Sequence, residues 1–377
     1  MKIEEFVSGT YKQQYQYQSF SPSKVNHQWV WENGTINTLL EDANRKLGAF
    51  DAFTTYIPDI EIYIKMHITK EATKSSMIEG TKTEIDDAVR KESEISPEKK
   101  DDWQEVQNYI EAMNKALDSL KQLPLSTRIL KDMHRILMKG VRGEHKNPGE
   151  YRTSQNWIGG ATLTDAAFIP PVHSEINELM GDLEKFIHNE DIQVPVLIKA
   201  AVAHYQFETI HPFLDGNGRI GRLLIILMLV DKGMLQRPAL YLSDYFERHR
   251  SLYIENLTKA REFNKLDQWI KFFLTGIVVT SDKGIETFRA ILKLKEEIEG
   301  KRIINLGKRV PNARKLVRYL FKNPIVSANE LKESLHVTVP TANSLIADFE
   351  RLAILRERTG WKRNREFEFT EYLKLFK

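Results

Sequence analysis

The chain has 377 residues, of which 41% are hydrophobic and 28% are charged, as in ordinary globular proteins. Its formal net charge of +3 is too small to indicate nucleic acid or a membrane surface as a partner. The sequence contains no cysteine, which excludes disulfides, thiolate zinc sites and cysteine nucleophiles.

The first residues lack the apolar core of a signal peptide, and the longest apolar run, residues 223–230, is too short to cross a bilayer. We therefore expect a cytoplasmic protein with no membrane contact. Residues 1–60 are polar at first, and a helix is predicted over residues 36–53. We expect this segment to pack against the domain that follows.

A second helix is predicted over residues 60–78. It ends at Gly80, a residue type that favours the left-handed turn after a helix. Its last turn carries Ser75 and Glu79. A glutamate at the C-terminal end of a helix is slightly unfavourable because of the helix dipole, and taken alone it is usually a solvated charge.

Two more helices are predicted over residues 97–123 and 127–137 from their 3–4 spacing of apolar side chains. The character then changes over residues 140–171, which are rich in Gly, Pro and Asn. Within them, residues 151–160 are typical of a strand or hairpin. A loop of this length inside a compact domain is usually functional or disordered.

Helices are predicted again over residues 174–187 and 194–210, and His204 on the second is expected to be buried and hydrogen-bonded. The next twelve residues, 211–222, are His-Pro-Phe-Leu-Asp-Gly-Asn-Gly-Arg-Ile-Gly-Arg. His211 can accept a proton near neutral pH, and Asp215 can bind a hard divalent cation through oxygen.

The rest of this stretch suits phosphate. Gly216 and Gly218 let backbone N–H groups turn toward an anion, and Arg219 and Arg222 offer planar forks for phosphate oxygens. Because an apolar helix follows, the glycine turn lies at a helix N-terminus, which favours phosphate. The residues therefore predict a site for a nucleoside triphosphate and Mg²⁺ beside a base, and the pattern is not a Walker-type P-loop. The alternative is a helix-to-helix turn with incidental charges.

The remaining body is expected to be helical over residues 245–263 and 266–279, and a charged helix over residues 281–299 is expected to lead to a separate domain. Residues 310–377 have the element order of a winged helix-turn-helix, with strand-like character over residues 354–369. Basic residues lie near its expected recognition helix and wing, namely Arg351, Arg356, Arg358, Lys362, Arg363 and Arg365. Acidic residues dilute this patch, so both DNA and protein remain open as partners.

Residues 211–222 resemble the signature of the Fic (filamentation induced by cAMP) family, His-Pro-Phe-x-Asp/Glu-Gly-Asn-Gly-Arg-x-x-Arg, at every fixed position. Ser75, Glu79 and Gly80 resemble the family's inhibitory-helix motif, Ser/Thr-x-x-x-Glu-Gly/Asn. The resemblance implies a mainly α protein, a Fic-fold helical bundle with a β-hairpin flap, followed here by the winged-helix unit.

We expect four parts on this basis. They are an N-terminal helical segment over residues 1–100 with the inhibitory helix at about 62–80, a catalytic domain over 101–280, a helical linker over 281–309 and the winged-helix-like unit over 310–377.

The implied activity is that of a protein adenylyltransferase, which transfers AMP from ATP to a Ser, Thr or Tyr hydroxyl of a target protein held at the flap. His211 would be the catalytic base, Asp215 the Mg²⁺ ligand, and Glu79 with Ser75 and Gly80 the inhibitory group that pairs with Arg222. The implied nucleotide-binding residues are Ile158, Gly159, Gly160, Gly216, Asn217, Gly218, Arg219, Ile220, Gly221, Arg222 and Tyr253.

Several alternatives stay open. The same motif supports other phosphate-group transfers or the reverse removal of AMP, with Glu79 aligning water, although two intact arginines favour AMP transfer. A DNA-binding regulator whose Fic body only senses nucleotide is a further alternative. The sequence does not identify the target protein or the activating signal. A homodimer is possible, and the sequence leaves open whether inhibition acts within one chain or between two.

Overall fold

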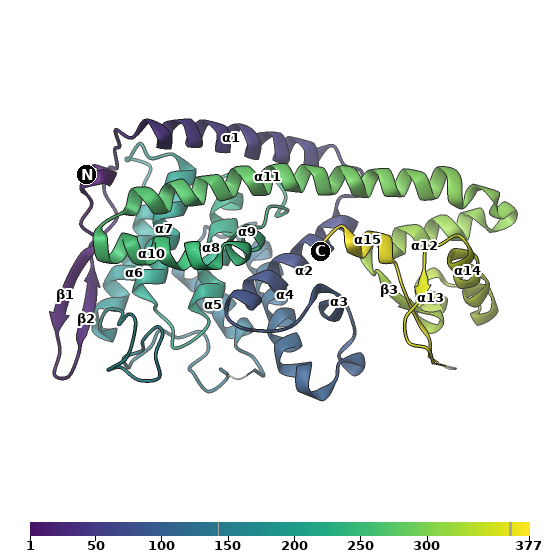
Figure 1. Ribbon diagram of the computed structural model, residues 1–377, viewed down its shortest axis with the longest axis horizontal. Coiled ribbons are helices and arrows are strands. Elements are labelled where there is room, and N and C mark those ends of the chain that lie inside the picture. Colours follow the sequence, from purple (N-terminus) through teal and green to yellow (C-terminus); the bar gives the residue numbers. More distant parts are fainter. Residues whose placement is uncertain (142, 362–363) are drawn as a thin grey trace.

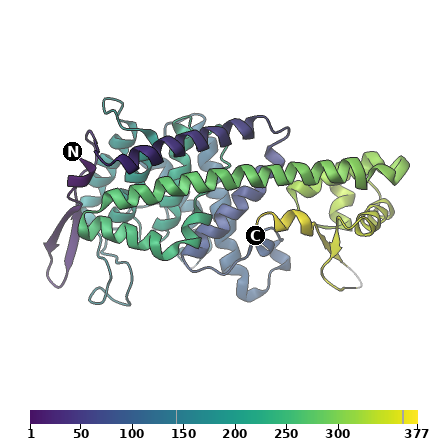
Figure 2. The ribbon, with the colours of Figure 1, turned by 45° about the horizontal axis from the view of Figure 1, so that its top comes forward.

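The computed structural model of the protein describes residues 1–141, 143–361 and 364–377. The molecule is elongated, and its longest element, α11 (Leu266–Glu297), runs from the helical body past the unit formed by the residues after 310 (Figure 1; Figure 2). α1 (Gly34–Thr55) packs along this helix. Within the described residues, no helix is both long and apolar enough to cross a bilayer.

The helical body holds the rest of the helices up to α11. They are α2 (Glu61–Ile78), α3 (Ile85–Ala88), α4 (Lys100–Leu120), α5 (Thr127–Leu137), α6 (Ile176–His188), α7 (Val196–Ile210), α8 (Asn217–Asp231), α9 (Ser243–Arg248) and α10 (Arg250–Phe263). Short 3-10 or π segments are η1 (Ile3–Glu5), η2 (Glu92–Glu94), η3 (Pro97–Lys99), η4 (His173–Glu175), η5 (Ile298–Arg302) and η6 (Ile304–Arg309).

α7 and α8 form the centre of the core. Every residue of α7 from Leu197 to Ile210 is buried, and so is nearly all of α8. A helix that is apolar on all sides is typical of burial inside a domain. The short connection between these two helices, residues 211–216, is therefore fixed at both ends by packed helices.

The C-terminal unit, residues 310–361 and 364–377, combines four helices with a three-stranded antiparallel sheet of order β3-β5-β4. In the sheet, Phe367 is paired with both Val326 and Glu357. The elements are α12 (Val310–Lys322), β3 (Ile325–Ser327), α13 (Ala328–Leu335), α14 (Val339–Arg351), β4 (Arg356–Glu357), β5 (Glu366–Glu368) and α15 (Thr370–Lys374). Lys362 and Arg363, expected on its wing, lie outside the described residues.

Three local expectations differ from the structure. The expected helices 266–279 and 281–299 form one helix, α11, because buried side chains such as Phe288 and Ile291 continue its apolar stripe past residue 280. The expected helix 245–263 is divided at His249 into α9 and α10. The N-terminal segment contains an unexpected hairpin of β1 (Gly9–Gln13) and β2 (Gln18–Pro22).

The expected flap hairpin consists of a single antiparallel bridge, Ile158 with Phe168, within the described part of residues 140–171. Gly159 and Gly160 both have positive φ, and Pro170 and Pro171 lack an N–H to donate, so the pairing does not extend into strands. The N-terminal hairpin supports this segment, because the Phe20 N–H donates to the Ile169 carbonyl at 2.9 Å.

Candidate active site

The connection from His211 to Gly216 is held in one conformation by Asn217. Its side-chain oxygen accepts from the Phe213 N–H and its side-chain nitrogen donates to the Phe213 carbonyl, each at 2.8 Å. The Phe213 ring is fully buried and stacks on His134, with ring centroids 3.9 Å apart. Phe213 thus packs into the core, and Asn217 positions the loop.

The hydrogen bonds of His211 define its tautomer. The residue ends α7 in the left-handed conformation, with φ of 50°. Its Nδ1 lies 3.3 Å from the Glu208 carbonyl oxygen, which can only accept, so Nδ1 carries the hydrogen and Nε2 has the free lone pair. Burial lowers the pKa of His211 to about 4, and the nearby Arg152 guanidinium acts in the same direction. His211 is therefore neutral at physiological pH.

Arg152 fixes the base of the flap against the His211 loop. Its buried guanidinium donates to the His211 carbonyl at 3.0 Å and to the Pro171 carbonyl at 2.5 Å. Asn156 adds a bond from its side chain to the Phe213 carbonyl at 2.8 Å. The flap segment and the loop that carries His211 therefore form one hydrogen-bonded assembly.

The first two turns of α8 carry the two arginines, and both are buried and paired with a carboxylate. Arg219 contacts Glu105 of α4 at 2.9 Å. Arg222 contacts Glu79 at 2.6 Å, and its guanidinium also donates to the side-chain and carbonyl oxygens of Ser75, both at 2.9 Å. The predicted partner of Glu79 is thus its partner in the structure, within one chain.

Glu79 lies directly over the N-terminal turn of α8. A Cβ atom on Gly218 would overlap the Glu79 Oε1 atom and come within 2.9 Å of Arg222 Nη1. Burial acts to raise the pKa of the Glu79 carboxyl, but the charges of Arg222 and Arg219 outweigh it and lower that pKa overall. The carboxylate is therefore ionised, and 39% of its side-chain surface remains exposed.

Asp215 lies at the entrance to the same turn. One carboxylate oxygen accepts from the Gly216 N–H at 2.7 Å, and the other is 2.9 Å from the Lys146 ammonium nitrogen. Burial acts to raise its pKa, and Lys146 outweighs burial and lowers it. The described residues contain no cluster of three or more His, Cys, Asp or Glu side chains that could hold a metal. A single half-exposed carboxylate fits Mg²⁺ only in the mode in which phosphate and water complete the coordination shell.

The other predicted nucleotide residues differ in accessibility. Ile220 is fully buried, so only the backbone of Ile220 and Gly221 could face a ligand. Tyr253 is 3% exposed, and its hydroxyl pairs with His204, whose second ring nitrogen lies 2.8 Å from the Gly221 carbonyl. His204 is buried and hydrogen-bonded, as predicted.

The flap glycines and four residues that sequence reasoning missed complete the site. Ile158 forms the flap bridge, and Gly159 and Gly160 follow it, both exposed. Sequence reasoning missed Glu105, Lys146, Arg152 and Asn156. The first comes from a distant helix with no motif of its own, whereas Arg152 and Asn156 lie in the stretch 151–160 that was singled out for its unusual composition.

Known proteins with a similar sequence match the helical body. The model described as Fic/DOC family N-terminal matches residues 37–118, and the Fic/DOC family model matches residues 124–229. A probable protein adenylyltransferase of Aquifex aeolicus (strain VF5) is 28% identical over 212 residues, which are 55% of this chain and 61% of that protein. The protein adenylyltransferase Fic of Drosophila erecta is 34% identical over 116 residues, 30% of this chain and 21% of that protein.

The chain therefore spans less than two thirds of the length of these relatives. Among solved structures, a Fic family protein from Desulfovibrio desulfuricans G20 has a TM-score of 0.57 at 18% identity, covering 90% of this chain and 96% of that one. Fic-1 from C. elegans has a TM-score of 0.52 at 18% identity, covering 68% of this chain and 75% of that one. Likeness at this identity indicates a shared fold. The two family models, matched in succession along the helical body, place the chain in the Fic/DOC family.

Proposed function

We propose that the protein is a protein adenylyltransferase, which transfers AMP from ATP to a hydroxyl group of a target protein. The observation that supports this most directly is the Glu79–Arg222 pair over the N-terminal turn of α8. A buried arginine and a helix N-terminus form an anion site, and a carboxylate from the protein itself now fills it. The relatives named as protein adenylyltransferases support the same reaction.

In this proposal His211 accepts the proton of the target hydroxyl at Nε2. The hydroxyl oxygen then forms a bond to the α-phosphorus of ATP while the bond from that phosphorus to the bridging oxygen breaks, and pyrophosphate leaves with the electron pair. His211 is neutral with a free Nε2, the state that a base requires. Negative phosphates nearby would raise its low pKa toward the range suited to proton transfer.

The remaining residues of the stretch bind and orient the triphosphate. Asp215 would hold Mg²⁺, which supplies positive charge to the phosphate oxygens when bound. Backbone N–H groups of residues 216–218 would line the anion site, with Arg219 at the β-phosphate and Arg222 at the γ-phosphate. Tyr253 and the flap residues 158–160 would lie toward the nucleoside. Positioning and charge stabilisation would then provide most of the rate.

Glu79 is proposed to hold the enzyme in a resting state, because an Arg222 bound to Glu79 and Ser75 is not available to the γ-phosphate. ATP would then be excluded, or bound with its α-phosphorus out of line. Gly80, which follows with φ of 101°, lets the chain turn away directly after this carboxylate. The target's hydroxyl, from Ser, Thr or Tyr, would be held beside His211 by the flap through backbone pairing.

The test is autolabelling with α-labelled ATP. Glu79→Gly should raise incorporation, and His211→Ala in that background should abolish it, with mass spectrometry showing addition of AMP rather than phosphate or phosphocholine. Loss of AMP from a pre-labelled protein, faster with Glu79 present, would instead support hydrolytic removal. An unchanged rate in Glu79→Gly would contradict the inhibitory role.

The C-terminal unit has the helix–strand–helix–helix–strand–strand order of a winged helix, with α14 in the position of a recognition helix. Two of its expected DNA-contacting arginines are paired with acids, Arg351 with Asp348 and Arg356 with Glu368. Because these acids reduce the net positive charge that a phosphate backbone would meet, we favour a protein partner over DNA. Salt-dependent binding of the full chain to duplex DNA, lost on replacing Arg358 and Arg365, would reverse that preference.

A further inference from the structure

The helix that carries Glu79 is also in contact with the C-terminal unit. At its last turn, α2 holds Arg222 through Ser75 and Glu79. Its first half faces the C-terminal unit, where the Tyr63 ring meets Phe321 edge-on at 5.3 Å and Lys65 donates to Asn323 at 2.9 Å. Figure 1 shows α15 and the end of the chain beside α2, far from the remote end of α11.

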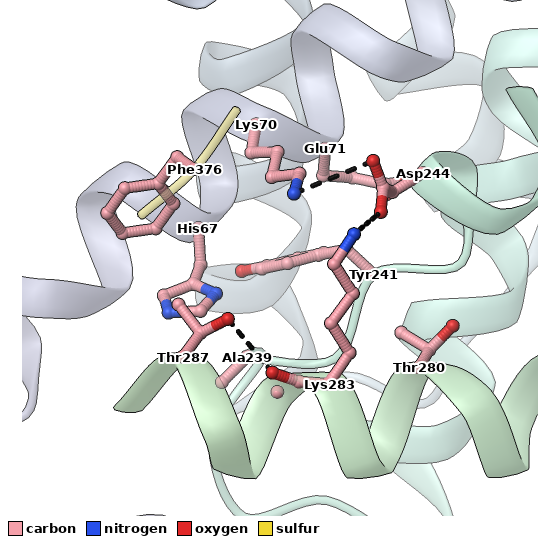
Figure 3. Close-up of a pocket in the computed structure, with 11 residues that line it drawn as sticks. His67, Lys70, Glu71, Ala239, Tyr241, Asp244, Thr280, Lys283, Thr287 and Phe376 are labelled. Atoms are coloured by element: carbon pink, nitrogen blue, oxygen red, sulfur yellow. Dashed lines mark hydrogen bonds and ion pairs between the residues drawn. The ribbon is translucent and has the colours of Figure 1, made fainter. Parts of the chain in front are cut away.

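Phe376, the penultimate residue, makes the innermost of these contacts. Its ring is 2% exposed and meets the His67 ring edge-on at 5.1 Å, while the other side of His67 stacks on Phe288 of α11 at 4.3 Å. Figure 3 shows Phe376 at one side of a small pocket that is also lined by Lys70 and Tyr241. The C-terminal residues thus cover the middle of α2.

Beside this pocket, the ion pair between Lys70 and Asp244 links α2 to α9. One carboxylate, Asp244, is shared by three cations, at 3.5 Å from Lys70, 2.6 Å from Lys283 and 3.3 Å from Arg248. Burial lowers the pKa of Lys70 to about 8, although Asp244 acts to raise it. Attraction between such groups weakens steeply as water enters. Removal of the Phe376 ring would therefore loosen the middle of α2 as well as its aromatic contact.

The segment between α2 and α4 also contacts the C-terminal unit. Lys377 pairs with Asp86, and Lys91 lies 2.6 Å from Glu330 of α13. The C-terminal unit therefore contacts the chain on both sides of Glu79. From His67 to Glu79 the helix extends about 18 Å, at about 1.5 Å per residue. The contact with Phe376 and the contact with Arg222 are therefore connected by one continuous helix.

We propose that the C-terminal unit controls the active site by holding α2 against the body, so that a partner that draws this unit away from α2 releases Arg222. The inference rests on the proposed inhibitory function of Glu79. By linkage, ATP binding would in turn weaken the contact between α2 and the C-terminal unit. The relevant partner is one that binds the C-terminal unit on a surface including α15 or the α12 face toward α2.

The test compares Phe376→Ala with Lys374→Ala, which removes an exposed side chain at the last residue of α15, two positions before Phe376. Phe376→Ala should raise autolabelling by on the order of tenfold, within the usual range of coupling between sites, and should speed hydrogen exchange over residues 61–78. Lys374→Ala should leave both at the wild-type level. Removal of residues 376–377 provides a second variant, and thermal unfolding shows whether each variant is folded.

The Glu79→Gly background separates this inference from the proposed function. There, Phe376→Ala should add no further labelling, because the inhibitory contact is already absent. If Glu79→Gly is active and folded Phe376→Ala labels like wild type, the control by the C-terminal unit is wrong while the proposed function stands. If Glu79→Gly is itself inactive, the proposed function fails, and hydrogen exchange over α2 still reports whether Phe376 holds the helix.

Discussion

The charge of Glu79 can be tested apart from its shape with Glu79→Gln, which keeps a side chain able to accept from Arg222. A hydrogen bond between charged partners contributes about 1 kcal/mol more than one with a neutral partner. The Glu79 and Arg222 side chains are 2.6 Å apart, and Arg222 is only 2% exposed whereas Glu79 is 39% exposed. Because water screens the exposed carboxylate, we take the free-energy difference between the charged and the neutral hydrogen bond to be no more than this value. A change of about 1 kcal/mol corresponds to roughly a 5-fold gain in apparent ATP affinity.

The assay is ATP binding by calorimetry, with autolabelling alongside. Glu79→Gln should gain about 5-fold and Glu79→Ala, which loses the whole interaction, about 30-fold, the ratio expected for roughly 2 kcal/mol. Both variants should also unfold at lower temperature without ATP, because a buried Arg222 loses its counter-charge, and ATP should raise that temperature more than in wild type. Equal ATP affinity in wild type and both variants would refute the reasoning.

Three other predictions concern the groups around His211. Asn217→Ala removes both hydrogen bonds to Phe213, so chemical denaturation should show a loss of about 1–3 kcal/mol. Arg152→Lys cannot reach the His211 and Pro171 carbonyls together, so in the Glu79→Gly background kcat should fall with little change in KM; a rise in KM alone would place Arg152 in binding. Burial lowers the pKa of His204 to about 3 in the folded protein. Between about pH 6.5 and 3 the unfolded chain therefore binds a proton at this residue that the folded protein does not, so the free energy of unfolding decreases as the pH is lowered through this range. His204→Gln should reduce this slope by up to about 1.4 kcal/mol per pH unit in unfolding measured from pH 6 to 4, and an unchanged slope would contradict the assignment.

The sequence allowed the local parts of the site to be predicted because they are consecutive. Residues 211–222 contain the base, the carboxylate and the glycine turn in one frame, and the apolar run after Arg219 places them at a helix start. The order of helices followed from apolar spacing in the same way. The Glu79–Arg222 contact was predictable only through the family resemblance, because 143 positions separate the two residues.

Contacts made by residues that belong to no sequence motif could not be predicted. Glu105 pairs with Arg219 from a helix whose pattern predicts only an amphipathic surface, and Phe376 reaches α2 from the end of the chain. The continuity of α11 was missed because its composition changes near residue 280 although its buried stripe does not. The flap was expected to be a β-hairpin, but only one bridge forms because the glycines after Ile158 have positive φ and Pro170 and Pro171 have no N–H to donate.

The ranges that the two family models match bear on the proposed control of the active site by the C-terminal unit. Both halves of α2, including Tyr63, His67, Ser75 and Glu79, fall within the family N-terminal match of residues 37–118, whereas the C-terminal unit lies beyond residue 229, outside both family models. Glu79 and Arg222 thus lie within the ranges matched by the family models, and Phe376, which contacts the helix of Glu79, lies outside them. Proteins with the same inhibitory pair and a different neighbour for the first half of α2 would then respond to different partners through one mechanism. Such a difference in response should arise from replacement of the residues that form the His67–Phe376 contact, while the Glu79–Arg222 pair stays the same.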